Sequence, residues 1–394
     1  MKLYNDETIR FIQENLTKDV NQLLLSAKKY AGTDVAFCAD QILSRRQIKD
    51  KLPGWYSNFN LWFPARITTE QCSSEQTATY KQRLFGGGTG CDMTGGLGID
   101  TYYISRNFER YIYMERFEEY CEAAIHNFKQ LDATNIEVLQ GDSMLLINQL
   151  PDLDFIYLDP ARRSDCNKRL YDLTECEPNI VELAPELLKK SPVVVVKVSP
   201  MADINRCIEL LPQTKEVHVV SVKNECKELL LILNREECSE DVKIHCVNFS
   251  TDGEQRYSFT TKEERNSGLR VVNIVDRYLY EPNSSVMKGG AFKSVADYYG
   301  LKKLHQHSHL YTSDKCVEDF PGRKFEVLKT EDFTKKWLQN SAKEDPKANL
   351  ATRNFPLSVA DIRKRSKIAE GGSLYLFATT LGDDRKVIVY CEKI

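Results

Sequence analysis

Residues 91–100, "CDMTGGLGID", place three glycines between two aspartates and directly follow a second glycine-rich run, "GGGTG" (86–90). The chain has only 19 glycines among its 394 residues, so this local density is unusual. Inside a regular element, glycine costs about 1 kcal/mol relative to alanine. The cluster therefore indicates a backbone that bends sharply here or approaches a ligand closely.

Strand-like and helical segments alternate after these glycines. The strand-like segments are 111–115, 136–142, 155–160 and 193–198, and a helical segment follows each of them. This alternation predicts βαβ units and an α/β fold with a parallel sheet covered by helices on both faces. Two further strand-like segments, 216–222 and 228–233, are separated by a linker too short for a crossover helix. We expect them to pair as an antiparallel hairpin at one edge of the sheet.

Acidic residues mark the ends of the predicted strands. Glu115 ends the second strand 23 residues after Asp92, where a carboxylate can accept hydrogen bonds from ribose hydroxyls. Asp142 closes the third strand, where it can accept from an adenine amino group. This spacing suits either a dinucleotide-dependent oxidoreductase or a methyltransferase that uses S-adenosylmethionine (SAM). The turn sequence DxxGGxGxD, in place of GxGxxG, and the edge hairpin favour the methyltransferase.

The chain also resembles known methyltransferases. "CDMTGGLGID", "YMERFEEYC" (113–121), "QGDSM" (140–144) and "YLDPARR" (157–163) resemble motifs I to IV of class I SAM-dependent methyltransferases. "DPARR", "KANLATRNFPLSVADIRKR" (347–365) and "GGSLYLFATT" (371–380) resemble the bacterial THUMP-like methyltransferase family. The resemblance covers about residues 70–236 and 321–394. It implies a Rossmann-like, seven-stranded, mostly parallel sheet, SAM as methyl donor and RNA as substrate.

The resemblance also implies a set of cofactor contacts. The methionine and ribose parts of SAM would lie against Asp92, Thr94, Gly95, Gly96 and Gly98, the ribose hydroxyls against Glu115 and the adenine against Asp142. One feature departs from the family pattern, because the first strand of this fold is normally apolar and "GGGTGCD" (86–92) consists mainly of glycine. The sequence therefore does not fix where the first strand begins.

The end of the fourth strand, Asp159-Pro160-Ala161-Arg162, bears on which atom receives the methyl group. Enzymes that methylate base amino groups often place an aromatic ring at this point, and here Tyr171 is the nearest candidate. Methylation at carbon 5 of a pyrimidine needs a cysteine nucleophile. Cys166 is the candidate for that role, with a bystander thiol as the alternative.

A third reading concerns the ribose hydroxyl. The set Lys81, Asp159, Lys197 and Glu228 resembles, in its order, the Lys–Asp–Lys–Glu tetrad of ribose 2′-O methyltransferases. In that chemistry carboxylates position a lysine that accepts the hydroxyl proton. Arg162 and Arg163 suit bidentate contacts with phosphate or a base edge. We take Asp159, Pro160, Arg162 and Lys197 as the candidate catalytic residues and leave the acceptor atom open.

The C-terminal stretch is locally basic. Residues 321–394 hold 15 Lys and Arg against 10 Asp and Glu, a net charge of +5 in a chain whose total is −3. A basic patch beside an aromatic ring can follow a phosphate backbone and stack a base. The candidate RNA-binding residues are Arg353, Phe355, Arg363 and Arg365, and a solvated helix face is the alternative explanation.

Three histidines lie at alternate positions in "LHQHSHL" (304–310). His305, His307 and His309 are expected on one face of a strand, with Asp314 close by in sequence. Such a set can bind a metal ion, but a polar strand face is the alternative that we favour, and we expect no bound metal.

The composition indicates a compartment. The twelve cysteines form no CxxC pair, which disfavours zinc ribbons and redox motifs and indicates a reducing environment without disulfide partners. The N-terminal residues lack the apolar core of a signal peptide, and no apolar stretch approaches the roughly 20 residues of a membrane span. We therefore expect a cytoplasmic protein with no membrane partner.

The length predicts several domains. We expect a helical region at 1–84, a SAM-dependent methyltransferase domain at 85–236, an α+β connecting module at 237–320 and a THUMP-like RNA-binding domain at 321–394. The expected function is SAM-dependent methylation of structured RNA, tRNA or rRNA, at a base or ribose position. The alternatives are methylation of a protein or small molecule, a non-catalytic factor that binds SAM and RNA, and, more remotely, a dinucleotide oxidoreductase.

Overall fold

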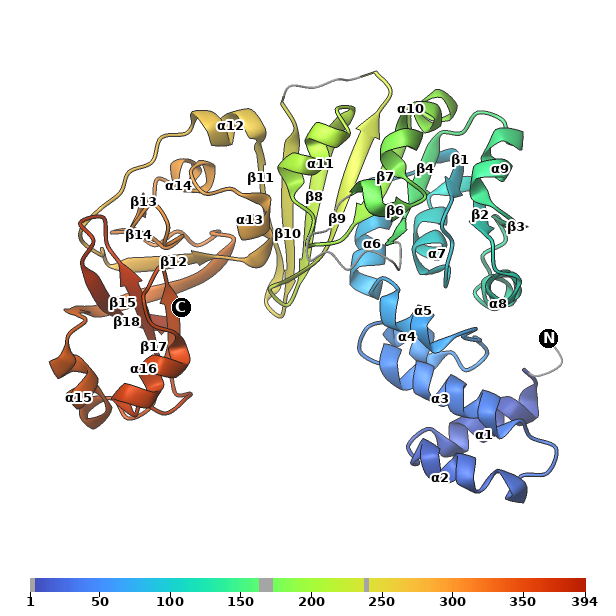
Figure 1. Cartoon of the computed structure of the whole chain (residues 1–394), viewed down its shortest axis with the longest axis horizontal. Coiled ribbons are helices and arrows are strands. Elements are labelled where there is room, and N and C mark those ends of the chain that lie inside the picture. Colours follow the sequence, from blue (N-terminus) through green and yellow to red (C-terminus); the bar gives the residue numbers. More distant parts are fainter. Residues whose placement is uncertain (1–3, 163–172, 237–240) are drawn as a thin grey trace. The chain divides into compact units, whose positions relative to one another are not determined.

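The computed structural model describes residues 4–162, 173–236 and 241–394 (Figure 1). Contacts within the chain define two compact units. The first comprises Met1–Lys215 and Leu230–Ser239, and the second comprises Glu216–Leu229 and Glu240–Ile394. The domain boundaries expected at residues 84, 236 and 320 stay a prediction. In the described parts of the chain, no helix has the length and apolar character needed to span a bilayer.

Short helices open the first unit. They are α1 (Asp6–Asn15), α2 (Val20–Leu25), the 3-10 turn η1 (Ala27–Lys29), α3 (Val35–Ile48), α4 (Pro53–Ser57), α5 (Arg66–Gln71) and α6 (Glu75–Leu84). Asn5, Asp19, Asp34 and Ser74 each accept a backbone N–H from the first turn of the helix that follows, so side-chain caps fix where four of these helices begin. The cap at Ser74 starts α6, the helix that carries Lys81.

The glycine-rich run opens a nine-stranded sheet. Its strands are β1 (Gly87–Asp92), β2 (Phe108–Glu115), β3 (Ile136–Gln140), β4 (Phe155–Leu158), β7 (Val193–Val198), β8 (Thr214–Val222), β9 (Glu225–Asn234), β10 (Lys243–Ser250) and β11 (Gly253–Thr260). Their spatial order is β11-β10-β8-β9-β7-β4-β1-β2-β3. The pairs among β1, β2, β3, β4 and β7 are parallel. The predicted seven-stranded α/β sheet is therefore present, with two strands added.

The predicted hairpin forms, but it does not lie at the edge of the sheet. Lys223 and Asn224 connect β8 to β9 with φ angles of 51° and 61°, the left-handed backbone of a two-residue hairpin turn. Beyond them, β10 pairs in parallel with β8, and β11 pairs antiparallel with β10. Ile244 and Cys246 of β10 are buried, so β10 covers an edge that β8 would otherwise expose. The expected edge position was wrong for this reason.

Packing explains the glycines of the first strand. An added Cβ on Gly90 would lie 2.6 Å from the ring of Tyr111, and one on Gly87 would lie 3.4 Å from the ring of Phe108. The rings of Phe108, Tyr111 and Phe155 contact one another at centroid distances of 5.3–6.4 Å. Large aromatic side chains on the flanking strands thus fill the space that apolar side chains of β1 usually occupy.

Helices connect the strands of this sheet. They are α7 (Ile99–Ser105), α8 (Glu118–Gln130), α9 (Ser143–Leu146), α10 (Ile180–Lys190) and α11 (Ile204–Leu210), with the 3-10 turns η2 (Ile147–Gln149) and η3 (Leu173–Glu175) and the short strands β5 (Ala161–Arg162) and β6 (Cys176–Glu177). Ala78 of α6, Tyr102 of α7 and Phe128 of α8 belong to one apolar cluster with Tyr113 of β2. Leu97 and Ile99 at the end of the glycine-rich turn belong to the same cluster, which therefore supports the turn from the side of the helices.

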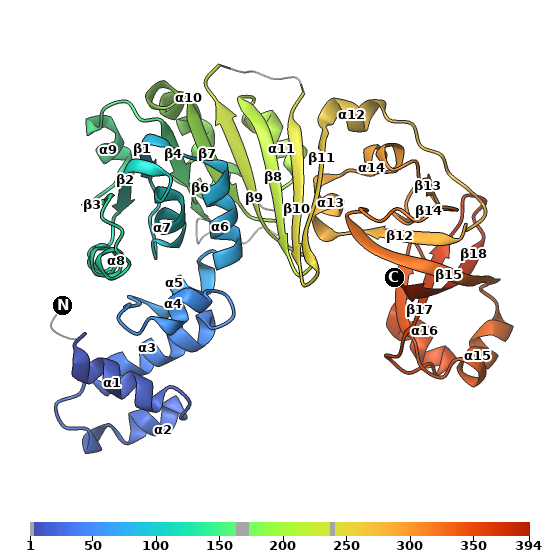
Figure 2. The ribbon, with the colours of Figure 1, turned by 180° about the vertical axis from the view of Figure 1, so that it is seen from behind.

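The second unit contains another sheet of seven strands. These are β12 (Tyr278–Pro282), β13 (Lys302–Lys303), β14 (Tyr311–Ser313), β15 (Gly322–Asp332), β16 (Asn349–Arg353), β17 (Leu374–Thr380) and β18 (Lys386–Lys393), in the order β13-β14-β12-β15-β18-β17-β16. Its helices are α12 (Thr261–Asn266), α13 (Ser284–Gly289), α14 (Ser294–Tyr298), α15 (Lys335–Glu344) and α16 (Val359–Ser366). Figures 1 and 2 both show α15 and α16 side by side, and Trp337 and Ile362 pack with Leu376 and Ile388 in one apolar cluster.

Candidate active site

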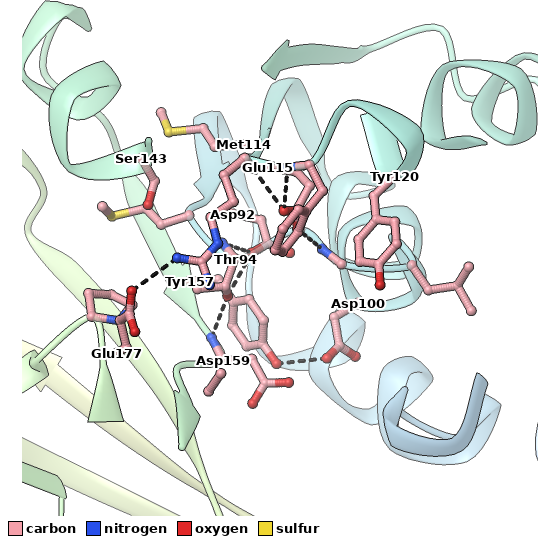
Figure 3. Close-up of a pocket in the computed structure, with 18 of the residues that line it drawn as sticks. Asp92, Thr94, Asp100, Met114, Glu115, Tyr120, Ser143, Tyr157, Asp159 and Glu177 are labelled. Atoms are coloured by element: carbon pink, nitrogen blue, oxygen red, sulfur yellow. Dashed lines mark hydrogen bonds and ion pairs between the residues drawn. The ribbon is translucent and has the colours of Figure 1, made fainter. Parts of the chain in front are cut away.

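A pocket of about 610 Å³ opens at the carboxyl ends of β1, β2, β3, β4 and β7. All of its lining residues belong to the first compact unit. Figure 3 shows how side chains from these different elements converge on it. The predicted cofactor residues Asp92, Thr94, Gly95, Gly96, Gly98, Glu115 and Asp142 all lie in its wall, as do Asp159 and Lys197 of the predicted catalytic set.

Asp92 organises the glycine-rich turn. Its Oδ1 accepts the backbone N–H of Thr94 at 2.9 Å, and its Oδ2 accepts the hydroxyl of Thr101 at 2.6 Å. The Thr94 hydroxyl oxygen accepts the backbone N–H of Asp159 at 2.6 Å, which ties the end of β1 to the end of β4. Burial raises the pKa of the Asp92 carboxyl to about 7, although the hydrogen bonds from Thr101 and Thr94 act in the opposite direction.

The three glycines of the turn serve different purposes. An added Cβ on Gly95 would lie 2.2 Å from the ring of Tyr113, whose hydroxyl donates to the carbonyl of Gly96 at 2.6 Å. Gly98 has a φ of 78°, and its Cβ would lie 2.8 Å from the ring of Phe128. Gly96 has a φ of 53°, and the nearest described atom to its Cβ would be 3.8 Å away. Packing therefore demands two of these glycines, whereas Gly96 leaves space open.

Glu115 is held at the end of β2 by backbone donors. Its Oε2 accepts the N–H of Gly96 at 3.0 Å, and its Oε1 accepts the N–H groups of Arg116 and Phe117 at 2.8 and 3.0 Å. A carboxylate has about four acceptor sites, so the oriented group can still accept hydrogen bonds from a ligand. The half-exposed ring of Phe117 lines the pocket together with Tyr120, at a centroid distance of 5.4 Å.

Asp142 has a similar dual position. Its Oδ1 accepts the backbone N–H of Met144 at 2.9 Å and so caps α9, while the residue also lines the pocket. Glu115 can accept hydrogen bonds from hydroxyl groups, Asp142 can accept one from an amino group, and the two aromatic rings offer an apolar surface. These are the groups that an adenosine-sized ligand requires.

Two lysines and two carboxylates form a second cluster at the pocket. Lys197 Nζ lies 2.5 Å from Asp159 Oδ2 and 3.5 Å from Asp100 Oδ2. Lys81 Nζ lies 3.1 Å from Asp100 Oδ1. The exposed fraction of these side chains rises from 0% at Lys81 through 10% at Asp100 and 13% at Lys197 to 40% at Asp159. Asp159 is therefore the member most accessible to a molecule in the pocket.

Asp100 is the centre of this cluster. Its Oδ2 accepts the hydroxyls of Ser73 at 2.8 Å and Tyr157 at 2.7 Å, the second of which is drawn in Figure 3. The Ser73 hydroxyl oxygen also accepts from Lys81 and Lys197, both at 3.2 Å. Burial opposes ionisation of Asp100, but the two lysines, helped by these hydrogen bonds, hold the pKa of its carboxyl well below the usual range.

Three residues of the predicted tetrad are linked by contacts: Lys81 and Lys197 both contact Asp100, and Lys197 contacts Asp159. Glu228 is buried on β9. Pro160 is buried after β4, outside the residues that line the pocket. Arg162 ends β5, and its side chain lies outside the described part of the chain, as do Arg163, Cys166 and Tyr171.

Asp100 and Ser73 belong to the cluster but were not among the residues predicted from the sequence. Asp100 lies in the first turn of α7, where an acidic residue usually interacts with the helix dipole in solvent. The sequence of α6 does contain a signal for Lys81, the lysine that contacts Asp100. Lys81 follows Thr77 by four residues and Ala78 by three, which places it on the buried face of the helix. A lysine at such a position needs a buried counter-charge.

The predicted RNA-binding residues have varied surroundings. Arg353 forms an ion pair with Glu281, which also pairs with Arg323. Phe355 packs against the α15–α16 cluster and contacts the ring of Phe333 at 4.9 Å. Arg363 donates to the carbonyls of Ile368 and Ala348 at 3.1 and 3.0 Å.

Arg365 remains exposed on α16. Lys364 and Lys367 beside it are also exposed, and so are Lys335 and Lys336 at the start of α15. The two helices therefore carry exposed positive charge, and Arg365 is a predicted RNA-binding residue that lies on this surface.

The histidine segment 304–310 is a loop between β13 and β14, so the expected strand was wrong. His305 lies 3.5 Å from Asp384 and 2.9 Å from the side-chain nitrogen of Asn354, and His309, with a φ of 47°, lies against the ring of Phe292 at 4.1 Å. The rings of His305 and His307 contact each other at a centroid distance of 5.5 Å, whereas the ring of His309 lies against Phe292.

Comparisons with known proteins cover the whole chain. A ferredoxin-like domain model matches residues 278–321, and a THUMP domain-like model matches residues 322–393. A candidate methyltransferase from Porphyromonas gingivalis W83, known from a crystal structure, is 34% identical in sequence to this chain. The two structures superimpose with a TM-score of 0.90, and the match covers 99% of each chain. The chain has no significant match among curated proteins.

More distant structures match part of the chain. One is TrmK of M. capricolum in complex with S-adenosyl-homocysteine (9% identity, 41% of this chain, 68% of that chain, TM-score 0.31). Another is the O-methyltransferase from Bacillus cereus in complex with the same molecule (16% identity, 42% of this chain, 83% of that chain, TM-score 0.31).

Proposed function

Because the chain belongs to the bacterial THUMP-like class I SAM-dependent methyltransferase family, we propose that it transfers a methyl group from SAM to structured RNA. The observation that carries the proposal is the pocket itself. The carboxylates of Glu115 and Asp142, which can accept hydrogen bonds from a ligand, line the same cavity as the half-exposed Asp159 and its partner Lys197. One part of the cavity thus fits the donor and the other fits the acceptor.

The residues present fit SAM. Glu115 would hold the ribose hydroxyls, because three backbone N–H groups fix its orientation without exhausting its acceptor capacity. The adenine would lie near Phe117 and Asp142, and the open space over Gly96 would receive the methionine portion. SAM supplies an activated methyl group when bound.

Asp159 and Lys197 would act on the acceptor. Asp159 would accept the hydrogen bond of an incoming hydroxyl or amino group and receive or pass on its proton, while the methyl-bearing carbon approaches. Lys197 would position Asp159, since the two side chains are in contact at 2.5 Å. Asp100, Ser73 and Lys81 would keep Lys197 in place from the buried side, so that most of the rate enhancement comes from positioning.

We also propose that residues 321–394 form the RNA-binding module and that 85–236 forms the catalytic domain. The support is the THUMP domain-like match together with the exposed basic residues of α15 and α16. Exposed lysines and arginines on neighbouring helices can follow a phosphate backbone without reading base sequence. Methylases of rRNA and TrmK are among the distant structural matches, which agrees with an RNA substrate.

The experiment is incubation of the purified protein with tritiated SAM and total RNA from a strain that lacks the gene. Label confined to one RNA size class would support the proposal, and digestion to nucleosides would then identify a base or ribose product. Label that persists in an RNase-treated lysate would instead identify a protein or small-molecule substrate. SAM binding without label in either fraction would identify a non-catalytic binding factor.

A further inference from the structure

Two histidines and a glutamate gather on the face of the nine-stranded sheet within the second compact unit. His218 and His245 are register partners on the parallel strands β8 and β10, and Glu216 precedes His218 by two residues. Residues two apart on a strand point to the same face of a sheet, so the three side chains project together. The opposite face of β10 is covered by α13, because an added Cβ on Gly289 would lie 2.6 Å from Cys246 Sγ.

The ligand atoms of these side chains converge. Glu216 Oε2 lies 3.3 Å from His218 Nε2 and 3.3 Å from His245 Nε2, and all three atoms lie within 4.8 Å of one another. A tetrahedral zinc ion with bonds of about 2.0–2.1 Å holds its ligand atoms about 3.3–3.4 Å apart. The two measured separations match this edge length and exceed the usual length of about 2.9 Å for an N–H···O hydrogen bond.

A second contact orients one of the ligands. His245 Nδ1 lies 2.9 Å from the hydroxyl of Ser258, its register partner on β11. Metal-binding histidines commonly donate their other ring N–H to such a partner, which leaves the Nε2 lone pair directed at the metal. The imidazole rings of His218 and His245 are stacked with centroids 4.5 Å apart, and the Nε2 atoms of both rings lie 3.3 Å from the same Glu216 oxygen.

Access and chemistry favour a divalent transition metal. The side chain of His218 is 4% exposed, whereas those of His245 and Glu216 are 21% and 31% exposed, so an ion can reach the cluster from one side. Two imidazoles and one carboxylate form a ligand set that zinc accepts, with a fourth position left for water. Among the residues that the structure describes, this is the group of histidines, cysteines and carboxylates with metal-ligand spacing.

We propose that Glu216, His218 and His245 form a zinc site that joins β8 to β10. The inference is independent of the methyltransferase function, because these residues lie outside the pocket at the ends of β1–β4 and β7. A metal ion here would link two strands that are far apart in sequence, the hairpin strand β8 and the added strand β10, and would stabilise their pairing.

The test is a Zn²⁺ titration of the full-length, metal-stripped protein against a chromogenic chelator, together with the metal content of the protein as purified. We expect one zinc ion per chain, an affinity at least about 100-fold weaker in His245→Ala and in Glu216→Gln, and about 10-fold weaker in Ser258→Ala. His307→Ala, which removes an exposed histidine from the 304–310 loop, is the matched control and should bind like the wild type.

Circular dichroism of each variant separates loss of binding from loss of folding. A wild-type protein that binds no zinc ion would overturn the proposal and identify the cluster as a hydrogen-bonded network. A folded Glu216→Gln or His245→Ala variant that binds zinc as tightly as the wild type would also overturn it.

Discussion

The candidate cofactor pocket and the C-terminal module both concentrate charged residues, but the surroundings of these residues differ. In the pocket, Asp159 and Lys197 face the cavity and are supported from behind by Asp100. In the C-terminal module, Arg353 pairs with Glu281 and Arg363 donates to backbone carbonyls, so both stabilise the fold itself. Position at the ends of parallel strands therefore grouped charged residues in one pocket, whereas the basic run placed two of its arginines in structural contacts.

The largest expected effect tests how strongly the pocket depends on its buried charges. Asp100→Asn should lower the free energy of unfolding by about 3–5 kcal/mol, because it removes a buried negative charge that contacts both Lys81 and Lys197. Glu281→Gln, which removes the ion-pair partner of Arg323 and Arg353 in the C-terminal module, should cost only about 1 kcal/mol, since these two arginines are 39% and 41% exposed. Urea denaturation of both variants gives the two values. Equal losses would remove the proposed difference between the regions.

The second prediction concerns pH and the turn after β1. The Asp92 carboxyl has a folded pKa of about 7, above its value in an unfolded chain, so the unfolded state releases this proton first. The protonated carboxyl therefore stabilises the folded protein fully below about pH 4. As the pH rises towards 7, the free energy of unfolding should fall by about 2–4 kcal/mol. Asp92→Asn should abolish this part of the pH dependence while retaining an acceptor for Thr94. Thermal unfolding of both proteins between pH 4 and 8 measures it, and parallel curves would contradict the assignment.

The third prediction concerns the rigidity of the glycine-rich turn. Gly95→Ala should destabilise the protein by about 1–3 kcal/mol and weaken SAM binding, because its Cβ would overlap the buried ring of Tyr113. Gly268→Ala is the matched control, since the structure describes open space around its Cβ. Isothermal titration with SAM and thermal unfolding give the two readouts. Normal SAM affinity in a folded Gly95→Ala variant would show that the turn adapts.

The smallest expected effect lies on the C-terminal helices. Replacing Lys364 and Arg365 together by alanine should weaken RNA binding several-fold and reduce the slope of log affinity against log salt by about 1–2, because each exposed cation releases about one counterion. Arg363→Ala, in contrast, should lower stability through its lost carbonyl contacts. Fluorescence anisotropy with labelled RNA at several salt concentrations measures the first effect. An unchanged slope would place the RNA elsewhere.

Much of the catalytic fold followed from local sequence patterns. The spacing of Asp92, Glu115 and Asp142 at the ends of successive strands predicted that they would meet, because parallel strands end at one edge of a sheet. The structure places all three in the wall of one pocket. The same rule grouped Asp159 with Lys197, which lie 2.5 Å apart.

Long-range packing set the limits of prediction. Asp100 is a partner of Lys81, and no local pattern links the two, since their contact depends on how α6 packs against α7. The added strands β10 and β11 were not expected in the first sheet because pairing with β8 involves residues far away in sequence. The glycines of 86–92 left the start of the first strand unpredicted, and contacts with the rings of Phe108 and Tyr111 explain them.

The central claim is that Asp159 acts on the methyl acceptor rather than on SAM. The most direct measurement compares single-turnover transfer of label from tritiated SAM to RNA by the wild type and Asp159→Asn, alongside SAM affinity by titration, with the exposed-loop variant Asp152→Asn as control. We predict that Asp159→Asn transfers label about 10²–10³-fold more slowly while its SAM affinity stays within a few-fold of the wild type. Wild-type transfer rates in this variant, or a loss confined to SAM binding, would contradict the account.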